Sequence, residues 1–429
     1  MIVFVEQITE RLIYSFDFIF GIRSITYQFT TNVDTFSNST DFKFNYSKRA
    51  LDSTAQIVPS SLLFETGIFQ FAPNRDLFFN EECLVFDEVV DPIASIFYLL
   101  SRMEEYHAAD LDKHDRFKAK NSVLSKYNWF EKAMCDRWAE DILKLLSSKG
   151  FPYDKPTQYP VKINPTFDID NVFAYQQKTG TRRLLAIAKD MLKGSKERLA
   201  ERKLVQAGKI NDPYNTFSSI AEIAKRGFEV NVFWLLGDFA KFDRNVAHTN
   251  KVQQNLIQLL SKDAEVGIHP SYKSSNNSAI VGMEVGRLKA ILGNEVKNSR
   301  QHYLRLRFPQ TYQSLIANKI HHDYTMGYAE NVGFRAGTAR PFLWFDLSQE
   351  KITTLAIHPF AYMDGTLLEY CVLSIEEAKN KITHLYNEVK QYGGDFSFIW
   401  HNETIGDYGT WIGWSAVLEH SLNLNYEEK

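Results

Sequence analysis

Two aspartates stand two positions apart in the segment TFDID, where Asp168 and Asp170 close a largely apolar run. In an extended strand both side chains would point to the same face, whereas in a loop one could face a metal ion and the other a water molecule. Carboxylate oxygens bind metals such as zinc together with imidazole nitrogens, and a carboxylate left off the metal can act as a general base. The alternative is an ordinary turn, in which aspartates are common.

Histidines follow two other apolar runs. His269 in VGIHPSY precedes a proline, which favours the end of a strand over the interior of a helix. His401 in FSFIWHNET has the same position after its run. Either histidine alone could be an ordinary loop residue, but acids and histidines at the ends of separate barrel strands converge in space. The pattern therefore predicts one polar site assembled from distant segments.

The elements that would position these residues alternate between strands and helices from residue 161 onward. Strands are predicted within 161–170, 228–239, 264–272, 296–303, 319–328, 355–362 and 396–403, and helices within 281–293 and 374–394. This alternation favours an α/β fold with a parallel barrel or open sheet, whose loops after the strands carry the chemistry. Arg300 and His302 follow a third such strand, in SRQHY.

The first part of the chain predicts a separate, smaller α/β domain. Residues 1–150 contain short apolar runs such as IVFV and CLVFDEVV, and helical patterns near 91–106 and 129–150. The segment 151–165 carries four of the twelve prolines and lacks helical periodicity, so it is the expected linker. We predict separately packed domains at residues 1–150 and 160–429.

The composition limits the classes of partner and the compartment. Acids exceed bases by only three, so the overall charge would not recruit nucleic acid or an anionic membrane. Three cysteines lie far apart without a CxxC pair, which argues against a disulfide scaffold or a thiolate zinc site: Cys83, Cys135 and Cys371. No apolar run reaches the roughly 18 residues of a membrane span, and charged residues interrupt the only stretch that is similar to a signal segment. We expect a soluble, cytoplasmic protein.

The motifs TFDID, GIHPSY, SRQHY and FIWHNE, in this order, resemble those of the NodB-like polysaccharide deacetylases (carbohydrate esterase family 4). The resemblance covers about residues 161–420, and residues 91–117 resemble the N-terminal domain of a bacterial subgroup of that family. It implies an irregular (β/α)7 barrel preceded by a smaller α/β domain. It also implies a metal-dependent hydrolase that removes N-acetyl or related acyl groups from an amino sugar or polysaccharide.

The same resemblance implies a role for each matching residue. Asp168 would be the general base, Arg300 would orient it, and His401 would protonate the leaving amine. A divalent metal, with zinc favoured, would be bound by Asp170 and His269. The family has a second histidine four residues after the first, but here that position is Lys273, whose ammonium is a poor ligand.

This departure leaves two possibilities open for the metal. Either His302 supplies the third ligand or metal binding has been lost. In the second case the protein would be a catalytically reduced glycan-binding or scaffold protein. A third possibility is a C–N hydrolase that acts on a non-sugar amide.

Four further residues are predicted to contact a carbohydrate substrate. Asp323 resembles an acidic position before the family's substrate loop, and Arg335 is a second polar candidate. His358 follows an apolar strand, and either a pocket or a structural position is possible for it. Trp400 adjoins His401, and aromatic faces stack on sugar rings. The oligomeric state is left open.

Overall fold

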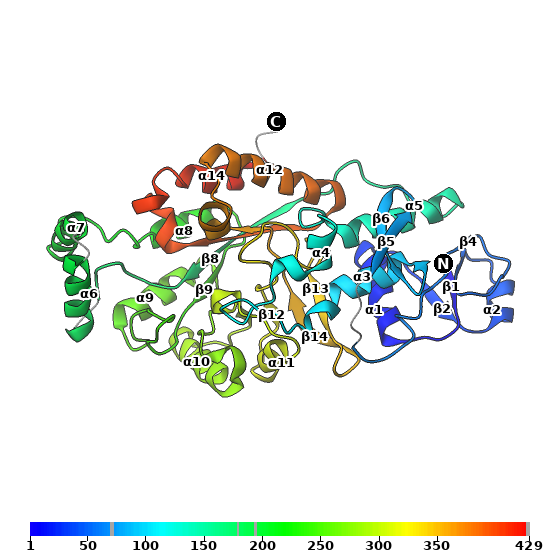
Figure 1. The fold of residues 1–429 in the computed structure, drawn as a ribbon, viewed down its shortest axis with the longest axis horizontal. Coiled ribbons are helices and arrows are strands. Elements are labelled where there is room, and N and C mark those ends of the chain that lie inside the picture. Colours follow the sequence, from blue (N-terminus) through cyan, green and yellow to red (C-terminus); the bar gives the residue numbers. More distant parts are fainter. Residues whose placement is uncertain (69–72, 178–179, 193–194, 426–429) are drawn as a thin grey trace.

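The computed structural model describes residues 1–68, 73–177, 180–192 and 195–425. These residues form three sheets, of four, nine and three strands. Figure 1 shows the four-stranded sheet at one end of the molecule, the nine-stranded sheet in the middle, and helices α6 and α7 at the opposite end. Among the residues so described, no helix combines the length and the apolar character needed to cross a bilayer.

The N-terminal part contains a small parallel sheet and a short antiparallel one. The parallel sheet has the order β2-β1-β3-β4, with the strands β1 (Ile2–Val5), β2 (Gln28–Thr30), β3 (Lys43–Tyr46) and β4 (Ala55–Gln56). The antiparallel strands are β5 (Asn74–Phe78), β6 (Glu81–Phe86) and β7 (Val89–Val90). The helices of this part are α1 (Glu10–Ile19), α2 (Val33–Asn38), α3 (Pro92–Leu100), α4 (Val123–Lys126) and α5 (Met134–Ser148). The predicted α/β character of this part is confirmed.

The central sheet has the order β13-β14-β12-β11-β10-β9-β8-β16-β15, and every neighbouring pair is parallel except β13 with β14. Its strands are β8 (Lys162–Ile169), β9 (Asn231–Trp234), β10 (Glu265–Ile268), β11 (Asn298–Ser299), β12 (His322–Asp323), β13 (Phe342–Asp346), β14 (Lys351–Ile357), β15 (Tyr362–Met363) and β16 (Asp395–His401). Between the described residues of β13 and β15 no pairing closes the sheet. The parallel α/β class is thus confirmed, whereas the barrel of seven strands stays a prediction.

Helices between the strands cover the faces of this sheet (Figure 1). The helices of this part are α6 (Gly180–Leu192), α7 (Lys196–Gln206), α8 (Phe217–Lys225), α9 (Lys251–Leu260), α10 (Ser278–Leu292), α11 (Gln310–Ala317), α12 (Ile375–Tyr392), α13 (Asn402–Ile405) and α14 (Ser415–Asn423). Of these, α6 and α7 stand at the end of the molecule, beyond the sheet (Figure 1). The two helices predicted from periodicity have local signals at their ends. Gly293, at a φ of 76°, terminates α10, and Ser374 with Glu377 forms a capping box at the start of α12.

The apolar core runs without a break from the N-terminal part into the central sheet. Tyr14 of α1 and Phe97 of α3 both pack against Phe345 of β13, with ring centroids 5.3 and 5.1 Å apart. Phe151, Tyr153 and Val161 of the predicted linker pack against the same core. The prediction of separately packed cores is therefore wrong, because apolar faces of α1 and α3 are buried against the sheet of the second part. The division at residues 1–150 and 160–429 remains a proposal.

A buried ion cluster also joins the two parts. Glu105 accepts hydrogen bonds from Nε of Arg102 at 2.8 Å and from Nε of Arg335 at 3.0 Å. Burial works against the charged carboxylate, but Arg335 and Arg102 outweigh it and hold the pKa of Glu105 below its usual range. The cluster fixes α3 and its following turn against the second part.

Removing this carboxylate should destabilise the fold. We expect Glu105→Gln to lower the free energy of unfolding by about 3 to 5 kcal/mol, because two buried guanidinium groups lose their shared counter-ion. Urea titration followed by circular dichroism measures the change. Glu6→Gln is the control, since the Glu6–Arg49 pair is exposed and should contribute less than about 1 kcal/mol. Equal stability of the two variants would contradict this role of the cluster.

Candidate metal centre

Asp168 lies near the end of β8, beside a buried arginine from the loop after β11. Nη1 of Arg300 donates to Oδ1 of Asp168 at 2.9 Å, and Nε of the same guanidinium donates to the carbonyl of Tyr324 at 3.0 Å. The guanidinium also lies over the ring of Phe233, 4.5 Å from its centroid. Arg300 thereby holds the Asp168 carboxylate in one orientation.

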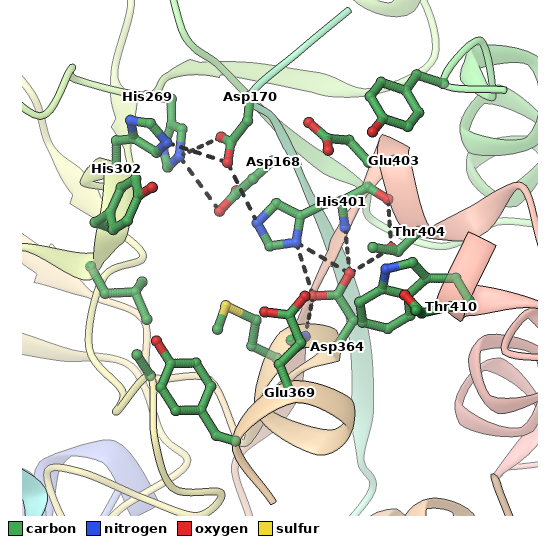
Figure 2. A pocket seen from close by; sticks show the side chains of 18 of the residues that line it. Asp168, Asp170, His269, His302, Asp364, Glu369, His401, Glu403, Thr404 and Thr410 are labelled. Atoms are coloured by element: carbon green, nitrogen blue, oxygen red, sulfur yellow. Dashed lines mark hydrogen bonds and ion pairs between the residues drawn. The ribbon is translucent and has the colours of Figure 1, made fainter. Parts of the chain in front are cut away.

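Asp170, His269 and His302 converge although they come from three loops. One ligand atom from each side chain lies within 4.8 Å of the others. Nε2 of His269 is 3.2 Å from Oδ1 of Asp170, and Nε2 of His302 is 3.3 Å from Oδ2 of the same carboxylate. Figure 2 shows both imidazoles pointing toward Asp170, with Asp168 beside them. The parallel register of β8, β9, β10 and β11 brings these loops to one edge of the sheet.

The hydrogen bonds of the two histidines define which ring nitrogens carry protons. Nδ1 of His269 contacts the carbonyl oxygen of Arg300, and Nδ1 of His302 lies 2.8 Å from Oδ1 of Asp243. Both partners only accept, so both Nδ1 atoms donate, and in a neutral ring Nε2 then carries a lone pair. When both rings are neutral, two imidazole lone pairs and the Asp170 carboxylate therefore face one another. This donor set fits a divalent transition metal.

Without a cation, the cluster would draw protons. Burial opposes the charged form of His302, but Asp170 and Asp243 outweigh it and raise its pKa to about 9. Burial likewise opposes ionisation of Asp170, but His302 and His269 outweigh it and hold its pKa well below the usual value. Both shifts have one cause: positive charge is stabilised beside the Asp170 carboxylate.

Lys273 is exposed, does not line the cavity at this centre, and is not part of the cluster. Beside Asp170 and His269, the third clustered side chain is His302. The sequence had left open whether His302 supplies a third ligand or metal binding is lost. The 3-10 turn after β11 starts at His302 and holds it toward the centre, with its imidazole 5.0 Å from that of His269 between ring centroids.

His401 faces the cluster from the end of β16. Its Nδ1 lies 2.9 Å from Oδ1 of Asp364, and its Nε2 lies 3.9 Å from Oδ2 of Asp170. Asp364 is itself held by the backbone N–H of His401 at 2.9 Å and by the hydroxyl of Thr404 at 2.6 Å (Figure 2). Burial disfavours the imidazolium, but Asp364 outweighs it and raises the pKa of His401 well above its usual value. A protonated imidazole can thus donate from Nε2 into the cavity.

The centre opens into a cavity of about 530 Å³. Its wall includes the side chains of Arg116 from the N-terminal part, Arg198 from α7 and Glu369 from the π-helical turn after β15. The aromatic side chains of this wall are Tyr214, Tyr303, Tyr370, Tyr408 and Trp411. This volume and mixed lining suit a small polar ligand with apolar faces.

The four predicted substrate-binding residues do not line this cavity in the described structure. Trp400 is fully buried, because successive residues of β16 point to opposite faces and His401 takes the one that faces the site. Arg335 is held by Glu105, and Asp323 is buried with its carboxylate bonded to Thr325. These positions correct the prediction of direct substrate contact.

His358 lies in a different place from the centre as well. Its imidazole stacks on Tyr324 with ring centroids 4.4 Å apart, and its Nε2 lies 3.0 Å from Nδ1 of His322. Burial lowers the pKa of His358 to about 3, so the ring is neutral. The structural alternative that the sequence left open for His358 fits this packing, and the adjacent His321 and His322 do not join the cluster.

Two carboxylates of the site were missed by sequence reasoning. Asp243 lies in the loop after β9 and accepts from both His302 and the backbone N–H of Tyr272, the latter at 2.8 Å. Asp364 follows β15 and orients His401. Each follows a short strand at the same edge of the sheet, and that position is the only signal in the sequence that could have indicated them.

Weakening the partner of His302 should weaken metal binding without removing a ligand. We expect Asp243→Ala to reduce zinc affinity by about 10- to 100-fold, because the imidazole loses the acceptor that fixes its tautomer and orientation. Competition with a chromogenic chelator measures the affinity. Asp238→Ala is the matched control from the same loop, since Asp238 is exposed and pairs with Arg287. Equal affinities of the two variants would show that Asp243 does not support the centre.

One family model and several solved structures match this chain. Residues 1–151 match a family described only as a family of unknown function, DUF7033. No curated protein sequence matches the chain. A solved structure from Mycobacterium smegmatis described as a polysaccharide deacetylase aligns at 14% identity and a TM-score of 0.40, covering 65% of this chain and 88% of the other.

Two further solved structures align over smaller shares of this chain. The polysaccharide deacetylase Bc1974 from Bacillus cereus aligns at 10% identity and a TM-score of 0.31, covering 62% of this chain and 88% of that one. IcaB from Ammonifex degensii aligns at 15% identity and a TM-score of 0.24, covering 39% and 85%. Polysaccharide deacetylases, the family that the sequence motifs resemble, are thus among the solved structures to which this chain is similar.

Proposed function

We propose that the protein is a metal-dependent hydrolase that removes N-acetyl or related acyl groups from an amino sugar or polysaccharide. The observation that carries this proposal is the convergence of Asp170, His269 and His302, with both Nδ1 atoms bonded elsewhere and both Nε2 atoms turned to the Asp170 carboxylate. Three protein ligands beside an open cavity are the arrangement of a catalytic zinc site. The proposal also takes the parallel strands as an irregular (β/α)7 barrel and residues 1–150 as its accessory domain.

The chemistry divides between the two sides of the centre. A bound divalent cation would supply Lewis acidity toward an amide carbonyl and a water molecule. Asp168 is held by Arg300 and lies 3.8 Å from His269. It would accept a proton from that water as the water oxygen attacks the acyl carbon. His401 would then donate a proton from Nε2 to the departing nitrogen as the C–N bond breaks. The products are a carboxylic acid and a free amine.

The pairing of His401 with Asp364 supports the acid role. An imidazole acts as a general acid only when it is protonated, and the Asp364 carboxylate stabilises that form. Asp168 has different surroundings, since the Arg300 guanidinium beside it holds its carboxylate in one orientation. The site therefore offers a base and an acid on different sides of one metal position.

A sugar substrate is supported by the lining of the cavity. Aromatic rings bury the apolar faces of sugars, and Tyr214, Tyr303 and Trp411 provide such rings around the centre. Polar groups beside them, such as Glu403, would bond hydroxyl groups of the ring.

The test is hydrolysis of N-acetylated sugars by protein loaded with zinc. Chito-oligosaccharides are incubated with the protein, and released acetate and new free amines are measured. We expect both products in equal amounts, loss of the activity with a chelator, and its return when zinc is added. Zinc-loaded protein that releases no acetate from these sugars would contradict the proposal, and activity on simple N-acyl amides alone would move it to a non-sugar substrate.

A further inference from the structure

Helices α6 and α7 pack against each other and stand at the end of the molecule far from the N-terminal sheet (Figure 1). Arg183 of α6 donates to Gln206 of α7 at 2.8 Å, and Asp190 of α6 pairs with Arg202 of α7. Val205 of α7 packs in a small apolar cluster with Tyr175, which attaches the pair to the rest of the protein. We refer to residues 180–206, in their described part, as the α6–α7 pair.

Four large apolar side chains are exposed among the described residues of the α6–α7 pair. Leu184 is 68% exposed and Met191 is 62% exposed, and their spacing of seven residues places them on the same side of α6. Leu192 is 90% exposed at the end of the helix, and Leu204 of α7 is 40% exposed. Scattered apolar side chains are common on protein surfaces, but a stripe on one protruding helix indicates a surface that another partner covers.

The charge of this segment is opposite to that of the whole chain. Residues 180–210 contain nine lysines and arginines against three acids, whereas the whole chain has a net charge of −3. Basic side chains that are exposed here include Arg183, Lys196, Lys203 and Lys209. One of the three acids, Asp190, is buried and paired with Arg202. The surface thus combines exposed leucine and methionine side chains with positive charge.

We propose that the α6–α7 pair binds to the surface of an anionic lipid bilayer. An amphipathic helix with basic residues beside its apolar stripe lies in the headgroup region, where apolar side chains enter the acyl boundary and cations meet lipid phosphates. Such a helix lies on the membrane and does not span it. The charge complementarity is local, so it is compatible with the nearly balanced charge of the whole chain.

A second copy of the chain is a poorer occupant of the same surface. Two α6–α7 pairs that faced each other would bring their basic side chains together, and this repulsion would oppose association. An anionic bilayer offers apolar contact and opposite charge at once. Arg198 of α7 also lines the cavity of the metal centre, so binding by this pair would bring the cavity close to the membrane surface.

The test uses the full chain and sedimentation with lipid vesicles. We expect the protein to sediment with vesicles of equal phosphatidylglycerol and phosphatidylcholine, to bind pure phosphatidylcholine much more weakly, and to lose binding in 0.5 M salt. Lys196→Gln with Lys203→Gln should lower the partition coefficient about 30-fold, since each basic side chain at such a surface contributes about fivefold. Leu184→Ser with Met191→Ser should lower it by at least about tenfold.

Matched controls separate the surface from the rest of the protein. Leu77→Ser removes a leucine of similar exposure, 65%, from β5, and Lys351→Gln removes an exposed cation from β14. Both should bind vesicles as the unchanged protein does, and circular dichroism checks that every variant is folded. Equal binding to neutral and anionic vesicles, or unchanged binding by both α6–α7 variants, would overturn the proposal. A dimer that forms without lipid and is lost in Leu184→Ser with Met191→Ser would assign the surface to a second copy instead.

Discussion

The Asp168→Asn variant is expected to keep its metal and to hydrolyse N-acetylated sugars about 100 to 10,000 times more slowly than the unchanged protein. The amide retains the size of the carboxylate and can still contact Arg300, but it cannot accept the proton of the attacking water. Because Asp168 is not among the three clustered ligand residues, zinc content should not change. Steady-state rates on chito-oligosaccharides and zinc analysis of the same preparation give both quantities.

The neighbouring aspartate provides the comparison. Asp170→Asn should lose zinc, since an amide is a weaker ligand than a carboxylate and this residue faces both histidines. The exposed Asp238→Asn should change neither zinc content nor rate. Loss of zinc in Asp168→Asn with full occupancy in Asp170→Asn would reverse the two roles.

The second large effect is expected on metal binding itself. His302→Ala should reduce zinc affinity by more than about 100-fold, because a direct nitrogen ligand is lost. This is more than the largest loss expected when a residue that only hydrogen-bonds to a ligand, such as Asp243, is removed. Protein purified without added metal should then contain little zinc, whereas the unchanged protein should contain about one equivalent. Elemental analysis measures the stoichiometry, and a chelator competition measures the affinity.

Two controls make this result specific. Lys273→Ala should bind zinc normally, since Lys273 is exposed and outside the cluster. His358→Ala removes another largely buried histidine and should also leave zinc binding intact. Since His302→Ala leaves Asp243 without its imidazole partner, thermal unfolding should be compared, and His302→Gln serves as a second variant with a more conservative volume. Full zinc occupancy in both His302 variants would remove this residue from the centre and favour the reduced, metal-free scaffold.

Much of the second part of the fold could be predicted because its local signals are strong. The strand before Asp168 and the strand before His401 are long apolar runs, and both were predicted close to the observed bounds of β8 and β16. Helices α10 and α12 carry their caps in the sequence. Strands β11, β12 and β15 have only two residues each, and so short a run has little periodicity of its own.

Some residues of the site could likewise be predicted from the local sequence, whereas others depend on contacts between distant segments. Asp168, Asp170, His269 and His401 could be chosen from the sequence because each lies in the last positions of a recognisable strand or directly after it. The roles of Asp243 and Asp364 could not be predicted, because each depends on a histidine that lies beside the aspartate only in the folded protein. These two contacts join residues 59 and 37 positions apart.

By itself, the sequence determined the α/β class, the strand ends that carry acids and histidines, and the motif order that resembles a deacetylase. Only the tertiary structure decided that His302 stands beside Asp170 and His269 while Lys273 remains exposed. It also turned Trp400 away from the cavity, paired Arg335 with Glu105, and joined the two parts in one core. The physical reason is that local sequence fixes secondary structure through periodicity and capping, whereas the direction and partner of a side chain depend on the packing of elements distant in the chain.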